Sequence, residues 1–291
     1  MDTVTDTVAM DTEAVIMKIS LSGGLVVLLD HIKAVNFVVF TTKQPNHRTL
    51  NLQYNTMFFT FKKSYKTSGY LNGFTDWHSH ILPGVDDGIR TMDDSLAVLD
   101  YYESLGMSEV WLTPHIMEDI PNTTDDLKKR FEELCKHYKG KLRLHLAAEY
   151  MLDNLFIQRL SDGDILTYGH NGKSVLVETS YIQAPYGFRN ILQDIQKAGL
   201  SPVLAHPERY QYMNENDYSQ LHSQGIHFQM NITSLVGGYG ISAQKRAVYL
   251  LERGYYSYYG TDVHSLSSVT RLMDKKAITK SELYMLNGIE D

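Results

Sequence analysis

The stretch FTDWHSHILPGVDDG, residues 74–88, packs two histidines and three aspartates around a Pro-Gly pair. Its first half has the character of a β-strand, in which every second side chain points to the same face. His78 and His80 are two residues apart, so both imidazole rings are expected on one face, together with Asp76. The stretch therefore predicts a strand that ends in a polar cluster.

The chain must turn at the Pro-Gly pair, and the turn can bring Asp86 or Asp87 back over the end of the strand. The pattern alone does not choose between these two aspartates. Imidazole and carboxylate groups are the ligands that suit divalent zinc, manganese or iron, so the stretch indicates a metal site. The alternative is an ordinary strand end with solvated polar side chains and an Asp-Gly turn, because a single HxH motif is short.

Downstream of this stretch, short apolar segments alternate with segments of helical periodicity, which is typical of parallel βα units. The expected strands are residues 73–77, 109–115, 142–150, 174–180, 201–207, 227–234 and 255–264. The expected helices are residues 92–105, 124–138, 154–160, 188–198, 217–223, 243–253 and 280–286. Seven strands that alternate with seven helices favour an α/β barrel. No glycine-rich phosphate loop follows any of these strands, which argues against a nucleotide-binding fold.

Length and composition narrow the class of protein. The 291 residues suffice for one large α/β barrel. A formal net charge of -7 disfavours binding to nucleic acid through phosphate contacts. The single cysteine, Cys135, excludes a disulfide framework and fits a reducing cytoplasm. It lies in a charged amphipathic segment, RFEELCKHYKG, so a structural role is favoured over a catalytic thiol.

Residues 1–56 differ in character from the rest and are interpreted as an N-terminal extension without a fold of its own, for which a misassigned start codon is one explanation. The alternative is a small peripheral hairpin. The apolar part of this extension is interrupted by Asp30, His31 and Lys33, before it reaches the ~20 apolar residues of a membrane span. Met57 opens a segment that resembles a bacterial amino terminus. We therefore expect residues 57–291 to form the functional domain, without membrane insertion.

Seven residues of metal-binding type fall at the ends of five predicted strands. Parallel strands in a βα barrel direct their carboxyl ends to one face, and that face carries the active site. Convergence of imidazoles and carboxylates from several strands indicates a polynuclear metal site. We expect other histidines, such as His137, His145 and His222, to be ordinary surface or core residues. The converging residues are His78, His80, His115, Glu149, His206, Asp262 and His264.

The motifs DWHSHILPGVDDG, TPH, AAEY, LAHPERY and GTDVHS occur in this order between residues 74 and 268. In these motifs the sequence resembles the polymerase and histidinol phosphatase (PHP) superfamily of metal-dependent phosphoesterases. Within it, the motifs resemble the bacterial protein tyrosine phosphatases of the capsule and exopolysaccharide type. The resemblance implies a distorted (β/α)7 barrel of the PHP type, in agreement with the seven strands counted from the apolar segments.

The resemblance also implies roles for individual residues. Glu149 would bridge two ions and a third ion would complete the cluster. Arg209 would hold the phosphate, and Glu149 and His206 are further catalytic candidates. Manganese is the implied metal, with iron or zinc as alternatives. The implied metal ligands are His78, His80, Asp87, His115, Glu149, His206, Asp262 and His264.

The implied reaction is hydrolysis of protein phosphotyrosine by a metal-activated hydroxide, without a covalent phosphoenzyme. The implied substrate is the tyrosine-rich tail of a bacterial kinase that controls polysaccharide export. A small-molecule phosphatase such as histidinol-phosphate phosphatase is the first alternative, and a metal-binding regulatory module without activity is the second. The segment HIMEDIP, residues 115–121, departs from the family because it is acidic where members often carry basic residues. A second family arginine has no clear counterpart, and Arg271 is the candidate.

Overall fold

The computed structural model describes residues 35–39, 53–57 and 62–287, and the chain divides into two units, residues 1–61 and 62–291. Within the first unit, β1 (Val35–Val39) pairs antiparallel with β2 (Gln53–Met57). Most of the predicted N-terminal extension, including its charged interruption at residues 30–33, lies outside the described residues. The second unit contains every residue singled out as a candidate ligand.

Two parallel sheets form the centre of the second unit. One contains β3 (Thr75–Ser79), β4 (Glu109–Leu112) and β6 (Arg143–Leu146). The other has the order β11-β10-β9-β8-β7-β5 and is parallel throughout. Its strands are β5 (His115–Ile116), β7 (Glu149–Met151), β8 (Ser174–Glu178), β9 (Ser201–Ala205), β10 (His227–Asn231) and β11 (Tyr256–Gly260). The prediction of an α/β fold with parallel strands is confirmed.

Two segments predicted as single strands are each divided in the structure. Thr113 and Pro114 separate β4 from β5, and Ala147 and Ala148 separate β6 from β7. Proline has no backbone N–H to donate to a ladder, which interrupts regular pairing at this point. Single hydrogen bonds still cross the break, from Ala147 N to Leu112 O at 2.9 Å and from Glu149 N to Pro114 O at 3.1 Å. Each break separates the three-stranded sheet from the six-stranded sheet.

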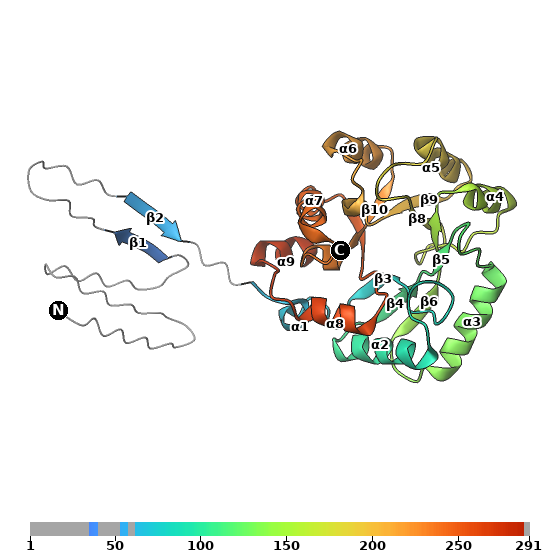
Figure 1. Ribbon diagram of the computed structural model, residues 1–291, viewed down its shortest axis with the longest axis horizontal. Coiled ribbons are helices and arrows are strands. Elements are labelled where there is room, and N and C mark those ends of the chain that lie inside the picture. Colours follow the sequence, from blue (N-terminus) through green and yellow to red (C-terminus); the bar gives the residue numbers. More distant parts are fainter. Residues whose placement is uncertain (1–34, 40–52, 58–61, 288–291) are drawn as a thin grey trace, which may run out of the picture. The chain divides into compact units, whose positions relative to one another are not determined.

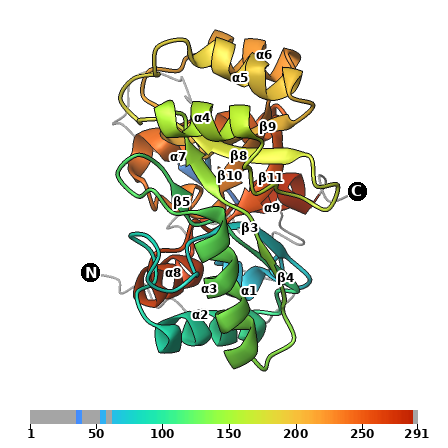
Figure 2. The same cartoon turned by 90° about the vertical axis from the view of Figure 1, so that its right-hand side faces the viewer.

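Helices surround the strands in chain order, as Figure 1 shows from α2 to α7. Seven of them overlap the predicted helices: α2 (Met92–Ser104), α3 (Thr124–His137), α4 (Asn154–Asp162), α5 (Phe188–Lys197), α6 (Glu215–Ser223), α7 (Gly240–Glu252) and α9 (Lys280–Asn287). In the view of Figure 2, α5 and α6 lie beyond one side of the strands and α2 beyond the opposite side. Short helical segments complete this unit: α1 (Tyr65–Ser68), η1 (Pro207–Arg209) and η2 (Ile232–Ser234).

The sequence did not predict α8 (Leu266–Asp274), which follows directly after the last predicted strand. After Leu266 come two serines, a valine and a threonine, which are weak helix formers, so propensity gave little signal. The helix begins at Ser265, whose hydroxyl accepts a hydrogen bond from Ser268 N at 3.3 Å. A serine cap is a start signal that the pattern of apolar residues did not reveal.

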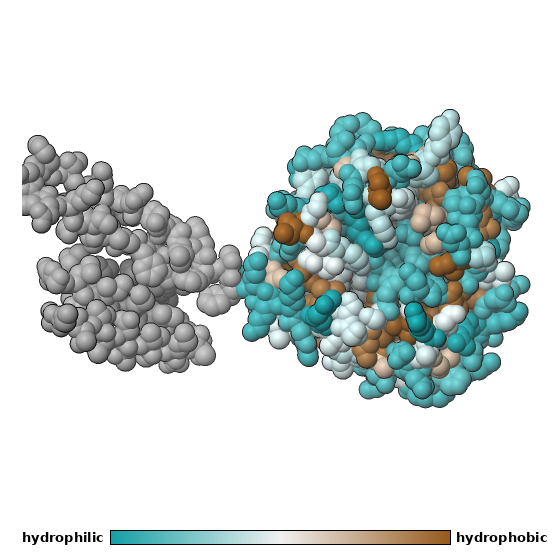
Figure 3. Space-filling view, viewed as in Figure 1, coloured by the Kyte–Doolittle hydropathy of each residue, from teal (hydrophilic) through white to brown (hydrophobic). Residues whose placement is uncertain are grey.

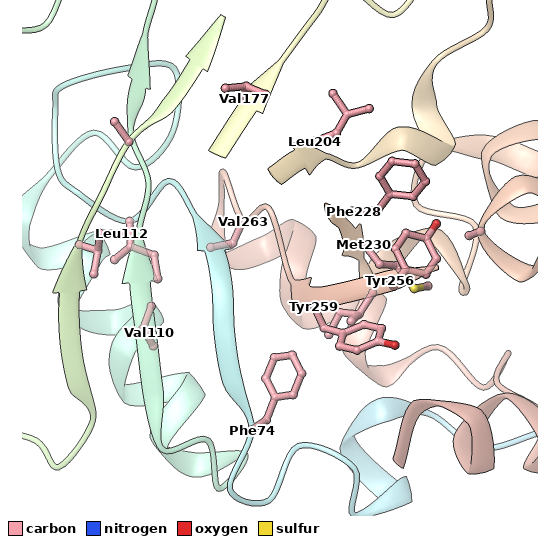
Figure 4. Packing of buried hydrophobic residues seen from close by; sticks show 14 of the residues in the cluster. Phe74, Val110, Leu112, Val177, Leu204, Phe228, Met230, Tyr256, Tyr259 and Val263 are labelled. Atoms are coloured by element: carbon pink, nitrogen blue, oxygen red, sulfur yellow. The ribbon is translucent and has the colours of Figure 1, made fainter. Parts of the chain in front are cut away.

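Apolar side chains from both sheets form the main core. Figure 4 shows Phe228, Met230, Tyr256 and Tyr259 gathered beside β10 and β11. All five residues of β8 are buried, as expected for a parallel strand that is covered on both faces. A second, smaller cluster comprises Trp111, Ala147, Tyr168, Leu176, Val203 and Ala205. Strand β8, which ends at the site, is therefore fixed by packing on both faces.

One face of this unit is mainly polar (Figure 3). On the face seen in Figure 3, hydrophilic residues cover most of the coloured surface, and apolar residues appear in separate small spots. Among the described helices, none combines the length and the apolar character that a membrane crossing requires.

Candidate metal centre

The polar residues singled out in the sequence gather where the parallel strands end. His78 belongs to β3, whereas His206 follows β9 and Asp262 follows β11. The sequence placed His115 and Glu149 at the ends of long strands. In the structure they are instead the first residues of the short strands β5 and β7, just beyond the two breaks. The breaks thus allow the chain to bend at the positions from which these two side chains reach the site.

Two residues of the site have a strained backbone. In the described part of the chain, His206 (φ 33°) and Asp262 (φ 54°) are the non-glycine residues with positive φ. Such a conformation costs about 1–3 kcal/mol per residue and persists where the surroundings enforce it. Asp262 N donates to the carbonyl of His78 at 2.8 Å, and His206 N donates to Gln229 Oε1 at 3.3 Å. These bonds hold both turns against β3 and β10.

The rings of His78 and His80 face one another at the centre of the site. His78 Nδ1 lies 2.8 Å from Gln229 Oε1, and His80 Nδ1 lies 2.8 Å from Asp86 Oδ2. The Gln229 amide nitrogen donates to the Met230 carbonyl, so its oxygen is the atom that accepts from His78. In neutral rings both Nδ1 atoms are then donors, and the Nε2 lone pairs face each other across 3.1 Å. A cation bound there would remove this repulsion.

Glu149 is the buried carboxylate around which the histidines converge. Its Oε2 lies 3.2 Å from His78 Nε2, 3.3 Å from His80 Nε2 and 3.2 Å from His115 Nδ1. Its Oε1 lies 3.0 Å from His206 Nε2. One carboxylate with different histidines at each oxygen has the arrangement needed to bridge two cations.

Asp262 divides its two carboxylate oxygens between different neighbours. Oδ1 lies 3.3 Å from His80 Nε2 and 3.6 Å from His78 Nε2. Oδ2 accepts hydrogen bonds from Asn231 Nδ2 at 2.7 Å and from the Tyr239 hydroxyl at 2.8 Å. The oxygen that faces the histidines is therefore free for a metal, while the other oxygen fixes the orientation of the carboxylate.

The structure distinguishes the two aspartates between which the strand pattern could not choose. Asp86 is fully buried, and its carboxylate accepts from His80 Nδ1 and from His115 N at 3.0 Å. The side chain of Asp87 is 67% exposed, and its Oδ1 lies 3.5 Å from both His115 Nε2 and His264 Nε2. Asp86 is thus placed to orient a histidine, and Asp87 is placed to share an ion with two histidines.

Glu178 is a candidate ligand that the sequence reasoning missed. It is the last residue of β8 and is buried. Its Oε1 lies 3.1 Å from His115 Nδ1, and its Oε2 lies 3.8 Å from His206 Nε2. The signal was present, because a carboxylate at the carboxyl end of a predicted strand obeys the same rule as the other candidates.

The donor atoms fit bound cations. Three overlapping groups in the described residues have ligand atoms within 4.8 Å of one another, and the buried atoms His115 Nδ1 and Glu149 Oε2 have no hydrogen-bond partner. Imidazole and carboxylate donors suit manganese, iron and zinc alike. His206 and Asp262 border these groups through their contacts with Glu149 and His80. The groups are His80, Asp87, His115 and His264; His78, His80 and Glu149; and His115, Glu149 and Glu178.

The same convergence sets the charges of the site. Burial alone lowers the pKa of His78, but Glu149 and Asp262 outweigh it and raise that pKa to about 9. Burial opposes ionisation of Glu149, yet the surrounding histidines hold the pKa of this carboxyl well below its usual range. A hydrogen bond with His264 lowers the pKa of Asp87 to about 2. In the absence of metal, protons on the histidines balance the carboxylates.

A cavity of about 240 Å³ opens beside these groups. Arg209, at the end of η1, borders the cavity with a side chain that is 17% exposed, and its Nη1 donates to Asp262 Oδ2 at 3.0 Å. A guanidinium next to a cluster of metal ligands is suited to hold an anion. The lining residues are Asp87, His115, Glu149, Tyr181, His206, Arg209, Tyr239, Asp262 and His264.

Several other residues considered in the sequence lie elsewhere. Cys135 is exposed on α3, and partial burial raises the pKa of its thiol, which disfavours the reactive thiolate. Arg271 lies on α8 and does not line the cavity. Asp76 shares its strand with His78, but its carboxylate accepts hydrogen bonds from Thr261 N and Oγ1 at 2.8 and 2.7 Å. It therefore ties β3 to the end of β11.

Comparison with known proteins supports the relation suggested by the motifs. The chain is 31% identical over 210 residues to tyrosine-protein phosphatase CpsB of Streptococcus pneumoniae, which covers 66% of this chain and 84% of that protein. It is 26% identical over 223 residues to tyrosine-protein phosphatase YwqE of Bacillus subtilis, covering 72% and 83%.

Among solved structures, the fold is similar to that of a chain from the crystal structures of YwqE of Bacillus subtilis and CpsB of Streptococcus pneumoniae. These two proteins are described as metal-dependent tyrosine phosphatases. The TM-score is 0.59 at 23% identity, over 74% of this chain and 87% of that one. A family model for capsular polysaccharide synthesis, CpsB/CapC, matches residues 74–282, which include all the candidate ligands and Arg209. The chain therefore belongs to the CpsB/CapC family of capsular polysaccharide synthesis.

Proposed function

We propose that this protein is a metal-dependent phosphatase that hydrolyses phosphotyrosine in a protein substrate. One observation carries the proposal: Glu149 lies within 3.3 Å of four histidines, and Arg209 borders the same cavity. The phosphatase relatives, YwqE and CpsB, support the choice of phosphotyrosine over a small phosphate monoester such as histidinol phosphate.

The proposed ligands would hold two or three divalent ions, with manganese as the first candidate and iron or zinc as alternatives. When bound, such ions supply Lewis acidity and an acidified water for attack near neutral pH. Glu149 is the proposed bridge, and Glu178 joins the ligands that the sequence predicted. The proposed ligand set is His78, His80, Asp87, His115, Glu149, Glu178, His206, Asp262 and His264.

The remaining residues would orient the ligands and the substrate. Asp86 and Gln229 hold the Nδ1 protons of His80 and His78, so both Nε2 atoms stay directed at the site. Arg209 would donate to the phosphoryl oxygens and stabilise their charge as the phosphoester bond breaks. Strong donors that are already in position act without reorganisation, which is the main electrostatic contribution that a chain can make.

We further propose that residues 57–291 form a distorted (β/α)7 barrel, with residues 1–56 as an extension outside it. If each divided segment counts as one strand, seven strands result, as the sequence predicted. A parallel bridge between Ser79 and Val263, together with a bond of 3.1 Å from His80 N to Val263 O, joins β3 to the segment after β11. These contacts support closure of the ring on that side.

The proposed partner is a tyrosine-phosphorylated bacterial kinase that controls capsule or exopolysaccharide synthesis in the cytoplasm. Support for it comes from the family description and the named relatives. The HIMEDIP segment is acidic rather than basic, and the carboxylate of its Glu118 accepts a hydrogen bond from Asn154 Nδ2 at 2.9 Å.

A side-by-side assay tests the proposal. The protein with added manganese should release phosphate from a phosphotyrosine peptide with a higher kcat/KM than from histidinol phosphate. A preference for histidinol phosphate would favour the small-molecule alternative, and hydrolysis of neither would support the regulatory module. Anomalous scattering from crystals soaked in manganese would count the ions in the same preparation.

A further inference from the structure

The guanidinium of Arg209 lies between two tyrosine rings. Its Cζ is 4.0 Å from the centroid of the Tyr181 ring and 4.2 Å from that of the Tyr239 ring. Tyr181 follows β8, and Tyr239 directly precedes α7, so the rings come from different elements of the fold. The guanidinium is thus in contact with two aromatic rings, which attract a cation electrostatically.

Both tyrosines are anchored to the surrounding structure, Tyr239 through its hydroxyl and Tyr181 through its backbone. The Tyr239 hydroxyl donates to Asp262 Oδ2 at 2.8 Å, the same oxygen that accepts from Arg209. The Tyr181 carbonyl accepts from Gln211 N at 2.8 Å, which joins its loop to the segment that carries Arg209. The two tyrosines and the arginine therefore form one connected unit.

The backbone below Arg209 is also anchored. The neighbouring Glu208 is fully buried and accepts from Asn231 N at 3.0 Å, from Ser234 Oγ at 2.8 Å and from the Tyr256 hydroxyl at 3.0 Å. These bonds fix η1 against β10 and β11. The side chain of Arg209 therefore extends from a rigid base, and only its own torsions remain to be restricted.

The contacts of Arg209 leave one edge of its guanidinium available. Within the described residues, Arg209 makes one side-chain hydrogen bond, from Nη1 to Asp262. Its Nε and Nη2 lie on the other edge and point their hydrogens in parallel, which is the fork that binds two oxygens of a phosphate. With two ring contacts and one hydrogen bond in place, the fork has a defined direction before any ligand arrives.

We infer that Tyr181 and Tyr239 are positioning residues, which clamp Arg209 so that its free fork is preorganised for the phosphoryl group of the substrate. The inference rests on the proposed phosphatase function. A flexible arginine would lose side-chain entropy on binding phosphate, whereas a clamped arginine has already lost it. The alternative is that the two rings only fill space beside the cavity.

A double-mutant cycle on the full chain loaded with manganese distinguishes these cases. We would measure the Kd of inorganic phosphate by calorimetry and kcat/KM with a phosphotyrosine peptide. Tyr181→Leu should weaken phosphate binding about tenfold, a cation–π contribution of ordinary size. Tyr181→Phe keeps the ring and should bind as wild type. Tyr186→Leu is the matched control, because Tyr186 is in the same loop but fully exposed.

The decisive comparison uses Arg209→Ala as the background. If Tyr181 acts through Arg209, Tyr181→Leu should cause no further loss of phosphate binding in that background. An equal tenfold loss with and without Arg209, or no loss in either, would overturn the clamp. Tyr239→Leu provides a second, independent cycle with the same expectation, and metal content is measured for every variant.

The two proposals fail in different ways. A wild-type protein that binds phosphate through a cooperative Tyr181–Arg209 pair but hydrolyses no phosphotyrosine would contradict the phosphatase and support the clamp. If the protein is an active phosphatase but the effects of the Tyr181 and Arg209 substitutions on phosphate binding are additive, only the clamp is contradicted. A loaded protein that binds no phosphate would also contradict the clamp.

Discussion

Arg209 Nη1 donates a hydrogen bond of 3.0 Å to Asp262 Oδ2, while Asp262 Oδ1 lies 3.3 Å from His80 Nε2. One carboxylate therefore links the arginine proposed to hold phosphate with the histidines proposed to hold metal. Arg209 and His80 contact different oxygens of this carboxylate, so its width sets the distance between the two sites. Arg209 and the bound metals would attract the same anion. A substitution on the arginine side of this contact is expected to affect anion binding, and a substitution on the histidine side is expected to affect metal binding.

Replacement of Arg209 tests the anion side. Arg209→Ala should retain its metals, since Asn231 and Tyr239 still hold Asp262 Oδ2. The loss of one strong donor at the transition state should lower kcat/KM, with a loss of transition-state stabilisation of about 2–4 kcal/mol. Arg271→Ala, on α8 and away from the cavity, is the control. Normal kinetics for Arg209→Ala with normal metal content would show that the arginine has no part in catalysis.

Replacement of Glu149 tests the bridge. Glu149→Ala removes the carboxylate that contacts four histidines, so bound ions would repel one another without a shared anion. We expect turnover of the phosphotyrosine peptide to fall below about a tenth of wild type and the metal content to fall with it. Circular dichroism should still report a folded protein. Substantial activity with unchanged metal content would remove Glu149 from the bridging role.

Asp86 and Asp87 should differ in their effects on metal binding. Asp86→Ala removes the partner that fixes the ring of His80, and loss of such an orienting group typically weakens metal affinity about 10–100-fold. Asp87→Ala should release one ion selectively, because Asp87 belongs to one of the three ligand groups, together with His80, His115 and His264. Metal titrations of the two variants measure the affinity and the number of bound ions. Equal, uniform weakening by both would contradict the separate roles.

The pH dependence of stability should differ between the metal-free and the loaded protein. In the metal-free protein the pKa of His78 is raised from 6.5 to about 9, so its stabilisation is complete below pH ~6.5 and is lost as pH rises through ~9. The lowered pKa values of Glu149 and Asp262 give stabilisation that is present above their unfolded values and lost in acid. Metal needs deprotonated imidazole and binds more tightly as pH rises.

The melting temperature of the chelated protein should therefore fall between pH 6.5 and 9, whereas that of the manganese-loaded protein should hold or rise. Thermal scans at several pH values in one ionic strength provide the comparison. The chelated His78→Gln variant is the control and should show a smaller fall. Parallel curves for chelated and loaded wild type would mean that the histidines are not the groups that exchange protons for metal.

Much of the fold and part of the site could be predicted because they depend on local patterns. Alternating apolar and helical segments predicted the parallel α/β fold, and the strand-end rule predicted the position of His206 near the site, whereas His115 lines the site as the first residue of β5. Pro114 itself indicates the break between β4 and β5, since proline interrupts a ladder of backbone hydrogen bonds. Helix α8 was not predicted because weak helix formers occupy residues 267–270, in its first half.

Contacts between distant segments could not be read from the chain. Gln229 is 151 residues from His78, and no local pattern indicates that it accepts from the ring. The same is true of the Tyr181 and Tyr239 rings on Arg209, which depend on how two loops meet. Glu178 is a different kind of omission, because it followed the strand-end rule and needed only that the rule be applied to every strand.

The most direct test of the metal-dependent mechanism combines metal removal with loss of the single thiol. Hydrolysis of a phosphotyrosine peptide is measured for wild type and Cys135→Ser, after chelation and after manganese is restored. Cys135 is on α3 and does not line the cavity. Both proteins should lose activity on chelation and regain it equally with manganese. Activity that survives complete metal removal, or a Cys135→Ser protein that is inactive with its metals bound, would contradict it.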